Sequence, residues 1–231
     1  MPYQQNGLLA VMSGEDRAIL TPFFELVQLK VGQHLFDTYE PIEHVYFFLS
    51  GLSSEIAVAN EMNRVEVGCV GKEGLSGHPV LLGVERSPHY SFMQVAGEAL
   101  RIRTPDLQKA MDDSSTLRKL LLRYVHVFMI QIASSAVSDA RFTIEQRLAR
   151  WLLMTQDRVG DRMPLTHEFL SLMLAVRRSR VTDAIHVLEG EHLIKAERGA
   201  TTVLDRAGLL KKAAGSYGKP EREYEDLIKA A

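Results

Sequence analysis

Short runs of alternating apolar and polar residues fill the chain between about residues 27 and 102. Examples are VQLK, VYFFLSG and RVEVGCVG, and glycine, proline or asparagine separates one run from the next. Several short strands at roughly ten-residue spacing, with turn residues between them, are typical of a β-sandwich or barrel. Within this part, we expect the stretch GKEGLSGHPVLLG, residues 71–83, to form a loop or a short helical turn.

The longest helical pattern runs from residue 115 to about residue 139. Its apolar side chains recur every three or four residues, at Leu117, Leu121, Tyr124, Phe128 and Ile132. A helix of this length spans about 35 Å, which is longer than a small domain needs. We therefore interpret these five residues as a helix–helix seam in a dimer. A helix that packs on its own β-domain remains an alternative.

Residues 165–204 contain two short helical segments followed by a strand–turn–strand pattern. The first helix is expected from about Thr166 to Leu174, and the second from about Arg177 to Gly190. Ala175 would lie where the two helices approach most closely. Strands on either side of Arg198–Gly199 complete the pattern of a winged helix-turn-helix, whose second helix enters the DNA major groove.

The start of this second helix carries the residues that favour DNA binding. An arginine there can donate two hydrogen bonds to guanine, and basic residues on the wing suit phosphate contacts. The predicted DNA-binding residues are Thr166, Arg177, Arg178, Ser179, Arg180, Thr182, Asp183, Lys195 and Arg198. The alternative is that the arginines belong to a solvated helix face.

The distribution of charge and the cysteine content limit which part of the chain can bind DNA and which cofactors the chain can hold. The net charge of the chain is −2, but residues 1–139 carry −5 and residues 140–199 carry +2, so the second part is the better DNA partner. Cys69 is the single cysteine, which excludes an intrachain disulfide and a four-thiolate iron–sulfur cluster. We expect a cytoplasmic protein, because we find no secretory leader and no apolar run of about 18 residues.

The chain resembles the Crp/Fnr family of bacterial transcription regulators over nearly its whole length. The resemblance rests on RLARWLL at 147–153, the helix-turn-helix with Arg178, VLEGEHLI at 187–194, and a β-rich front half joined by a long helix. It implies an α+β protein with a β-roll (jelly-roll) sensor domain at 1–114, a dimerisation helix at 115–139, a winged helix-turn-helix at 140–213 and a tail at 214–231.

The family resemblance also implies a function. It points to a homodimer that binds double-stranded DNA at a palindromic site and contacts RNA polymerase, with no enzymatic activity. Arg178 matches the family arginine that commonly contacts guanine. Ser179 stands where many members have a base-reading glutamate, and Asp183 where some have another arginine, so we expect a different sequence preference.

Members of the family that bind cyclic nucleotides share a segment in which a glutamate accepts from the ribose and an arginine neutralises the phosphate. The corresponding positions here are Gly77, His78, Arg86 and Ser87, which are the candidate effector site. His78 replaces the glutamate, so we do not expect cyclic AMP, and the effector is left open. The spacing of His44, Cys69, His78 and His89 fits no tight haem-ligand motif, and no cofactor or metal is expected.

Two other classes of protein compete with a DNA-binding regulator. A cupin-like metal enzyme would need a His-x-His motif, which the sequence lacks, and it would leave the helix-turn-helix unexplained. A protein-interaction module that has lost DNA binding is the other alternative, against which Arg178 and the basic wing argue.

Overall fold

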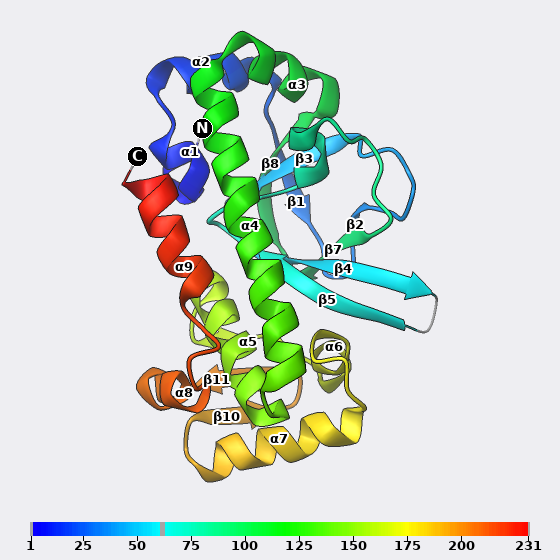
Figure 1. The fold of residues 1–231 in the computed structure, drawn as a ribbon, viewed down its shortest axis with the longest axis vertical. Helices are drawn as coiled ribbons and strands as arrows, with labels where there is room; N and C mark the ends of the chain where they lie inside the picture. The colour runs from blue at the N-terminus through cyan, green and yellow to red at the C-terminus, as the bar shows by residue number, and fades with distance from the viewer. Residues whose placement is uncertain (1, 61–62, 231) are drawn as a thin grey trace.

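The computed structural model describes residues 2–60 and 63–230, which form an amino-terminal β-roll, a long central helix and a carboxy-terminal unit (Figure 1). Four short helical segments precede the roll: η1 (Tyr3–Gln5), α1 (Gly7–Val11), α2 (Gly14–Leu20) and η2 (Thr21–Phe23). The Asn6 side chain caps α1 by accepting from the backbone N–H groups of Leu8 and Leu9, and it donates to the carbonyls of Phe48 and Gly74.

The roll consists of two antiparallel four-stranded sheets. One sheet has the order β1 (Glu25–Leu29), β8 (Gly97–Arg103), β3 (His44–Phe48) and β6 (Leu75–Ser76), and the other has β2 (His34–Phe36), β7 (Tyr90–Val95), β4 (Leu52–Asn60) and β5 (Asn63–Val70). The turn η3 (His78–Leu82) lies between β6 and β7, inside the stretch where a loop or turn was predicted. Apolar side chains such as Phe47, Leu75 and Leu100 are fully buried in the core of this part of the chain, and the two sheets confirm the predicted β-roll.

Two helices follow the roll, namely α3 (Thr104–Asp113) and the long α4 (Ser115–Arg141). Ser114 caps α4, because its hydroxyl accepts from the N–H of Leu117 at 3.2 Å. By length and composition α4 could cross a membrane, and 39% of its most apolar window is buried within the chain. One face of α4 packs against the roll, where Leu121 is fully buried.

The carboxy-terminal unit is a bundle of helices with a small sheet. Its elements are α5 (Ile144–Val159), β9 (Arg162–Met163), α6 (His167–Met173), α7 (Arg178–Gly190), β10 (Ile194–Glu197), β11 (Ala200–Val203) and α8 (Arg206–Lys212). Thr143 and Gln146 form a capping box at the start of α5. The core of the unit includes Leu152, Val181 and Leu188, all fully buried.

This unit lies against the outer face of the sheet β2-β7-β4-β5. The rings of Phe92 on β7 and Phe169 on α6 stack with centroids 6.1 Å apart. Ile56 on β4 belongs to the same apolar cluster as the core of the carboxy-terminal unit. The roll and the unit therefore share a continuous buried contact.

The tail comprises α9 (Lys219–Tyr224) and the π-helical turn η4 (Glu225–Lys229), and it runs beside α4 back toward α1 (Figure 1). The Tyr224 hydroxyl donates to the carbonyl of Glu73 at 2.7 Å, and Arg123 on α4 donates to the carbonyl of Leu227 at 3.4 Å. Ile228 is 1% exposed. The tail thus ties the end of the chain to both α4 and the roll.

Candidate nucleic-acid interface

Helices α6 and α7 form the predicted helix-turn-helix. Thr166 caps α6, since its hydroxyl accepts from the N–H of Phe169 at 3.2 Å. Helix α7 buries Val181 and Leu188 against the unit and turns its other face to solvent. Ala175, predicted to lie where the two helices approach most closely, is in the turn that joins them, with a φ of 49° and an exposed side chain.

The three arginines at the start of α7 are exposed. Arg177 is the N-cap residue of α7, and Arg178 and Arg180 lie in its first turn. Among the described residues, none of the three guanidinium groups takes part in a side-chain hydrogen bond or an ion pair. Three unpaired cations on one helix end are available to bind an anion or a base edge.

The remaining predicted residues of α7 lie on the same exposed side. Ser179 and Asp183 are exposed, whereas Thr182 is half-buried and its hydroxyl oxygen is 3.2 Å from Nδ1 of His167 on α6. The prediction from sequence did not include His167, because a contact between two helices is not visible in the spacing of residues along one chain.

The wing is the hairpin of β10 and β11, paired from Ile194–Val203 to Glu197–Ala200. Arg198 is exposed in its turn, and Gly199 supplies the positive φ of 77° that the turn requires. The ammonium group of Lys195 lies 2.8 Å from Glu197, an exposed pair that raises the pKa of the lysine. Arg198 is therefore available to bind a phosphate directly, whereas Lys195 would first have to break its ion pair with Glu197.

Comparison with known domains identifies this unit. Residues 146–212 match the model of the Crp-like helix-turn-helix domain. This part of the chain is a Crp-like helix-turn-helix domain. The match covers α6, α7 and the wing, so the prediction of a DNA-binding domain of this type is confirmed.

The whole chain has the fold of Crp/Fnr regulators, as predicted. It is similar to FixK2 from Bradyrhizobium japonicum, with 14% identity, a TM-score of 0.68 and coverage of 81% of this chain and 96% of that one. TTHA1359, a CRP/FNR-family regulator from Thermus thermophilus, has 22% identity and a TM-score of 0.64, over 83% of this chain and 100% of that one. A putative Crp/Fnr regulator from Eubacterium rectale has 14% identity and a TM-score of 0.67, over 92% and 100%. No curated protein sequence matches the chain.

The residues predicted as a dimer seam face the interior of the same chain. Leu117 and Leu121 are 0% exposed, and Tyr124 and Phe128 are 3% exposed, all within the core that α4 shares with the roll. Ile132 is partly buried against that core. A side chain that is already buried within its own chain has no exposed surface with which to contact a partner. The assignment of these residues to a dimer seam was therefore wrong. The alternative, a helix packed on its own β-domain, describes this face of α4.

The opposite face of α4 is open to solvent and carries a second regular pattern. We call it the exposed stripe, and it consists of Leu122, His126, Met129, Ala133, Ala136 and Ala140. Its spacing alternates between four and three residues, which is the repeat of a coiled-coil seam. Leu122 is 40% exposed and Met129 is 58% exposed, with Val137 at 56% beside the stripe.

The four candidate effector residues make separate local contacts. The His78 ring packs on Phe128 of α4 with centroids 4.4 Å apart, and burial lowers its pKa to about 4. Arg86 is exposed and donates to the carbonyl of Tyr39 at 2.6 Å. The hydroxyl of Ser87 accepts from a backbone N–H two residues on, and Gly77 supplies a left-handed turn.

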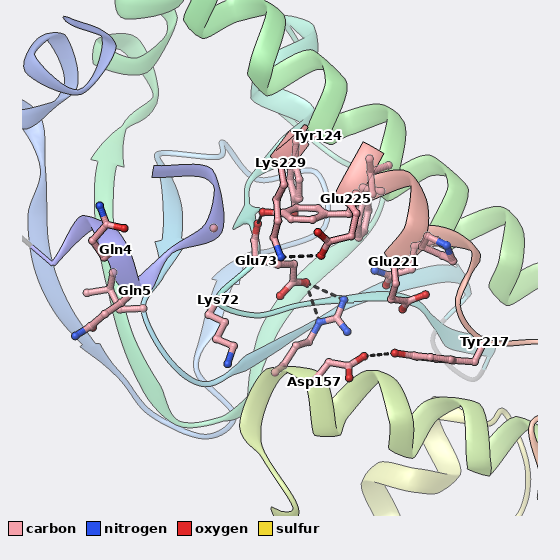
Figure 2. Close-up of a pocket in the computed structure, with 18 residues that line it drawn as sticks. Gln4, Gln5, Lys72, Glu73, Tyr124, Asp157, Tyr217, Glu221, Glu225 and Lys229 are labelled. Carbon is pink, nitrogen blue, oxygen red and sulfur yellow. Dashed lines mark hydrogen bonds and ion pairs between the residues drawn. The ribbon is translucent and has the colours of Figure 1, made fainter. Parts of the chain in front are cut away.

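A cavity of about 670 Å³ lies elsewhere, where the start of the chain, the loop after β5, α4, the end of α5 and the tail meet (Figure 2). Its charged residues are largely paired with one another. Arg158 contacts Glu73 at 2.8 Å, Lys229 contacts Glu225 at 2.6 Å, and Figure 2 shows Tyr217 donating to Asp157. The volume is in the range of small-molecule sites.

Two buried glutamates of the roll were not predicted from the sequence. Glu55 accepts from the Ser76 hydroxyl at 2.8 Å inside the roll, and Glu66 accepts from the indole N–H of Trp151 at 2.8 Å on its outer face. Burial raises the pKa of each carboxyl to about 7. Their positions in alternating strands resemble ordinary exposed residues, so only the tertiary structure reveals them.

Metal ligation finds no support in the arrangement of side chains. Residues 2–60 and 63–230 contain no group of three histidine, cysteine, aspartate or glutamate side chains placed to hold a metal ion. Cys69 is buried, and burial raises the pKa of its thiol to about 12, which disfavours the thiolate that metals bind.

Proposed function

We propose that this protein is a sequence-specific DNA-binding transcription regulator that acts as a homodimer on a palindromic site. The observation that carries the proposal is the set of three exposed, unpaired arginines at the head of α7 in a Crp-like helix-turn-helix domain. Helices in this position of the motif enter the major groove with their amino-terminal residues against the bases.

In the proposed complex the residues divide into two groups. Arg178 reads guanine through two hydrogen bonds, and Ser179, Thr182 and Asp183 face the neighbouring base pairs. Arg177, Arg180, Thr166, Lys195 and Arg198 hold the sugar–phosphate backbone, which sets the register of the protein but does not read the sequence. Affinity should therefore fall steeply as salt is added.

The exposed stripe on α4 is the proposed contact between the two copies. Two such stripes, packed together, would bury Leu122 and Met129 and place two copies of α7 on one side of a duplex.

We place the protein in the cytoplasm, with RNA polymerase as a further partner. Its role is regulatory and not enzymatic, and we retain the division into roll, dimerisation helix, helix-turn-helix unit and tail.

The candidate effector residues do not favour cyclic AMP. His78 stands where a ribose acceptor is needed, and its ring is packed on Phe128. The cavity beside the tail touches the roll, α4 and α5, so a molecule bound there would contact the roll and one of the helices that pack against α7.

Selection from randomised DNA duplexes tests the proposal. The full-length protein should enrich a palindrome whose half-sites are about 10 base pairs apart, centre to centre, or a multiple of that distance. Binding should weaken by orders of magnitude between about 50 and 200 mM salt. A protein that enriches no sequence over the starting pool would contradict the proposed function.

A further inference from the structure

We propose that Thr182 reads a base that presents an exocyclic amino group in the major groove, adenine or cytosine, and that His167 imposes this choice without touching DNA. This inference rests on the proposed function and adds to it one specificity-determining residue and one positioning residue. Two contacts of a single hydroxyl group carry it.

Thr182 lies one helical turn after Arg178 on α7, on the side that is open to solvent. Its hydroxyl oxygen is 3.2 Å from the carbonyl oxygen of Arg178 and 3.2 Å from Nδ1 of His167. His167 is the first residue of α6, so its ring reaches Thr182 from the neighbouring helix. Both side chains are half-buried, which leaves part of the Thr182 hydroxyl accessible.

The direction of these two hydrogen bonds follows from counting protons. A threonine hydroxyl has one proton to donate and two lone pairs to accept with. The carbonyl of Arg178 can only accept, so the hydroxyl proton points to it. Nδ1 of His167 must then carry a proton and donate it to one of the two lone pairs.

One lone pair therefore remains on Thr182, and no proton. In the major groove adenine offers its N6 amino group and cytosine its N4 amino group as donors, whereas guanine and thymine offer acceptors at O6, N7 and O4. The free lone pair of Thr182 can accept a hydrogen bond from either amino group, whereas it is repelled by the acceptor atoms of guanine and thymine. The position read by Thr182 should favour adenine or cytosine.

His167 acts here through Thr182. Without the ring, the hydroxyl has a second free lone pair and only the carbonyl of Arg178 as a neighbour, so no donor opposes rotation of its proton toward guanine or thymine. An asparagine at this position places an amide N–H close to where Nδ1 lies, and it should restore the arrangement. A role in stability alone would not depend on that N–H.

The test uses the full-length protein and four versions: wild type, Thr182→Val, His167→Ala and His167→Asn. Each is first used for selection from randomised duplexes, and its affinity is then measured on four duplexes that differ only at the affected base pair. Wild type should favour adenine or cytosine by about two- to tenfold, the factor expected for one hydrogen bond. Thr182→Val and His167→Ala should lose this preference, and His167→Asn should keep it.

Three results would overturn the inference while leaving the proposed function intact. These are a wild-type preference for guanine or thymine at this position, a preference that survives in Thr182→Val, or His167→Asn behaving like His167→Ala. Arg178→Ala serves as the control, because it should alter a different base pair. If the wild-type protein enriches no sequence, the proposed function itself fails.

Discussion

The indole N–H of Trp151 donates to the carboxylate of Glu66 at 2.8 Å, across the boundary between the helix-turn-helix unit and the roll. Trp151 is 3% exposed and Glu66 is 6% exposed. The second carboxylate oxygen of Glu66 has no hydrogen-bond partner among the described residues. This hydrogen bond therefore compensates in part for the burial of the carboxyl group, together with Ser54 and the charges of Arg150 and Arg158.

Trp151→Phe should lower the free energy of unfolding by about 1–3 kcal/mol, because it leaves a buried acceptor without a donor. Urea denaturation followed by circular dichroism measures the change. The same substitution should cost less when Glu66 is already replaced by Leu, since no acceptor is left. Equal losses in the two backgrounds would show that packing, and not the hydrogen bond, accounts for the effect.

Glu55 should make the stability of the protein depend on pH. Burial raises its pKa from 4.5 to about 7, so the folded protein holds a proton that the unfolded chain releases. Its contribution to stability is complete below pH 4.5 and is lost as the pH rises through 7. Glu55→Gln should therefore gain stability relative to wild type between about pH 5 and pH 8, by up to about 3 kcal/mol.

The control for this titration is Glu98→Gln, at a half-buried position on β8 outside the core of the roll. Thermal unfolding of each variant and of wild type over the same pH range gives the comparison. A difference between Glu55→Gln and wild type that does not change with pH would mean that Glu55 is not a buried neutral carboxyl group.

The exposed stripe on α4 should hold the dimer. Met129→Glu places a charge in the proposed seam and should give a folded monomer, because burying an unpaired charge is costly. Sedimentation velocity measures the mass. Leu121→Glu should instead prevent folding, as Leu121 is in the core of the single chain. A Met129→Glu protein that remains dimeric would move the interface away from this face.

Arg178→Ala should remove about 1–3 kcal/mol of discrimination between the preferred base and its competitors at one base pair. The measurement is the affinity for the selected site and for duplexes changed at each position. Arg198→Ala is the matched comparison, and it should weaken binding to all duplexes alike. An unchanged discrimination in Arg178→Ala would assign base reading to another residue.

The docking of the tail can be tested at its most buried residue. Ile228→Ala should cost about 2 kcal/mol of stability or more, because it removes a buried isoleucine side chain. Asp226→Ala, an exposed neighbour, should cost little. If both substitutions are neutral in urea denaturation, the tail does not pack against α4 in solution.

The sequence predicted best those elements whose contacts join residues that are close together along the chain. The helix-turn-helix and the wing were predicted correctly because their caps, apolar spacing and turn residues lie within about 40 positions of one another. Ala175 shows the limit of this approach, since the tight turn forces a positive φ on an alanine, and no residue type in the sequence indicates it.

Helix α4 shows why the dimer face was misassigned. It carries two apolar stripes with the same three- and four-residue spacing, one through Leu121 and one through Leu122. Periodicity identifies both stripes but does not say which one packs on the roll, because that depends on where distant strands lie. The contact between His167 and Thr182 and the burial of Glu66 are non-local in the same way.

The position of the tail has a consequence for the order of events during synthesis. The ribosome makes α9 and η4 after the roll, α4 and the helix-turn-helix unit, yet they cover part of α4 and meet the loop that holds Glu73. Domains generally fold as they emerge, so the roll, α4 and the helix-turn-helix unit can assemble while that side of α4 is still bare. A nascent chain stalled before residue 218 would therefore leave that side of α4 uncovered and differ structurally from a chain in which α9 and η4 have docked.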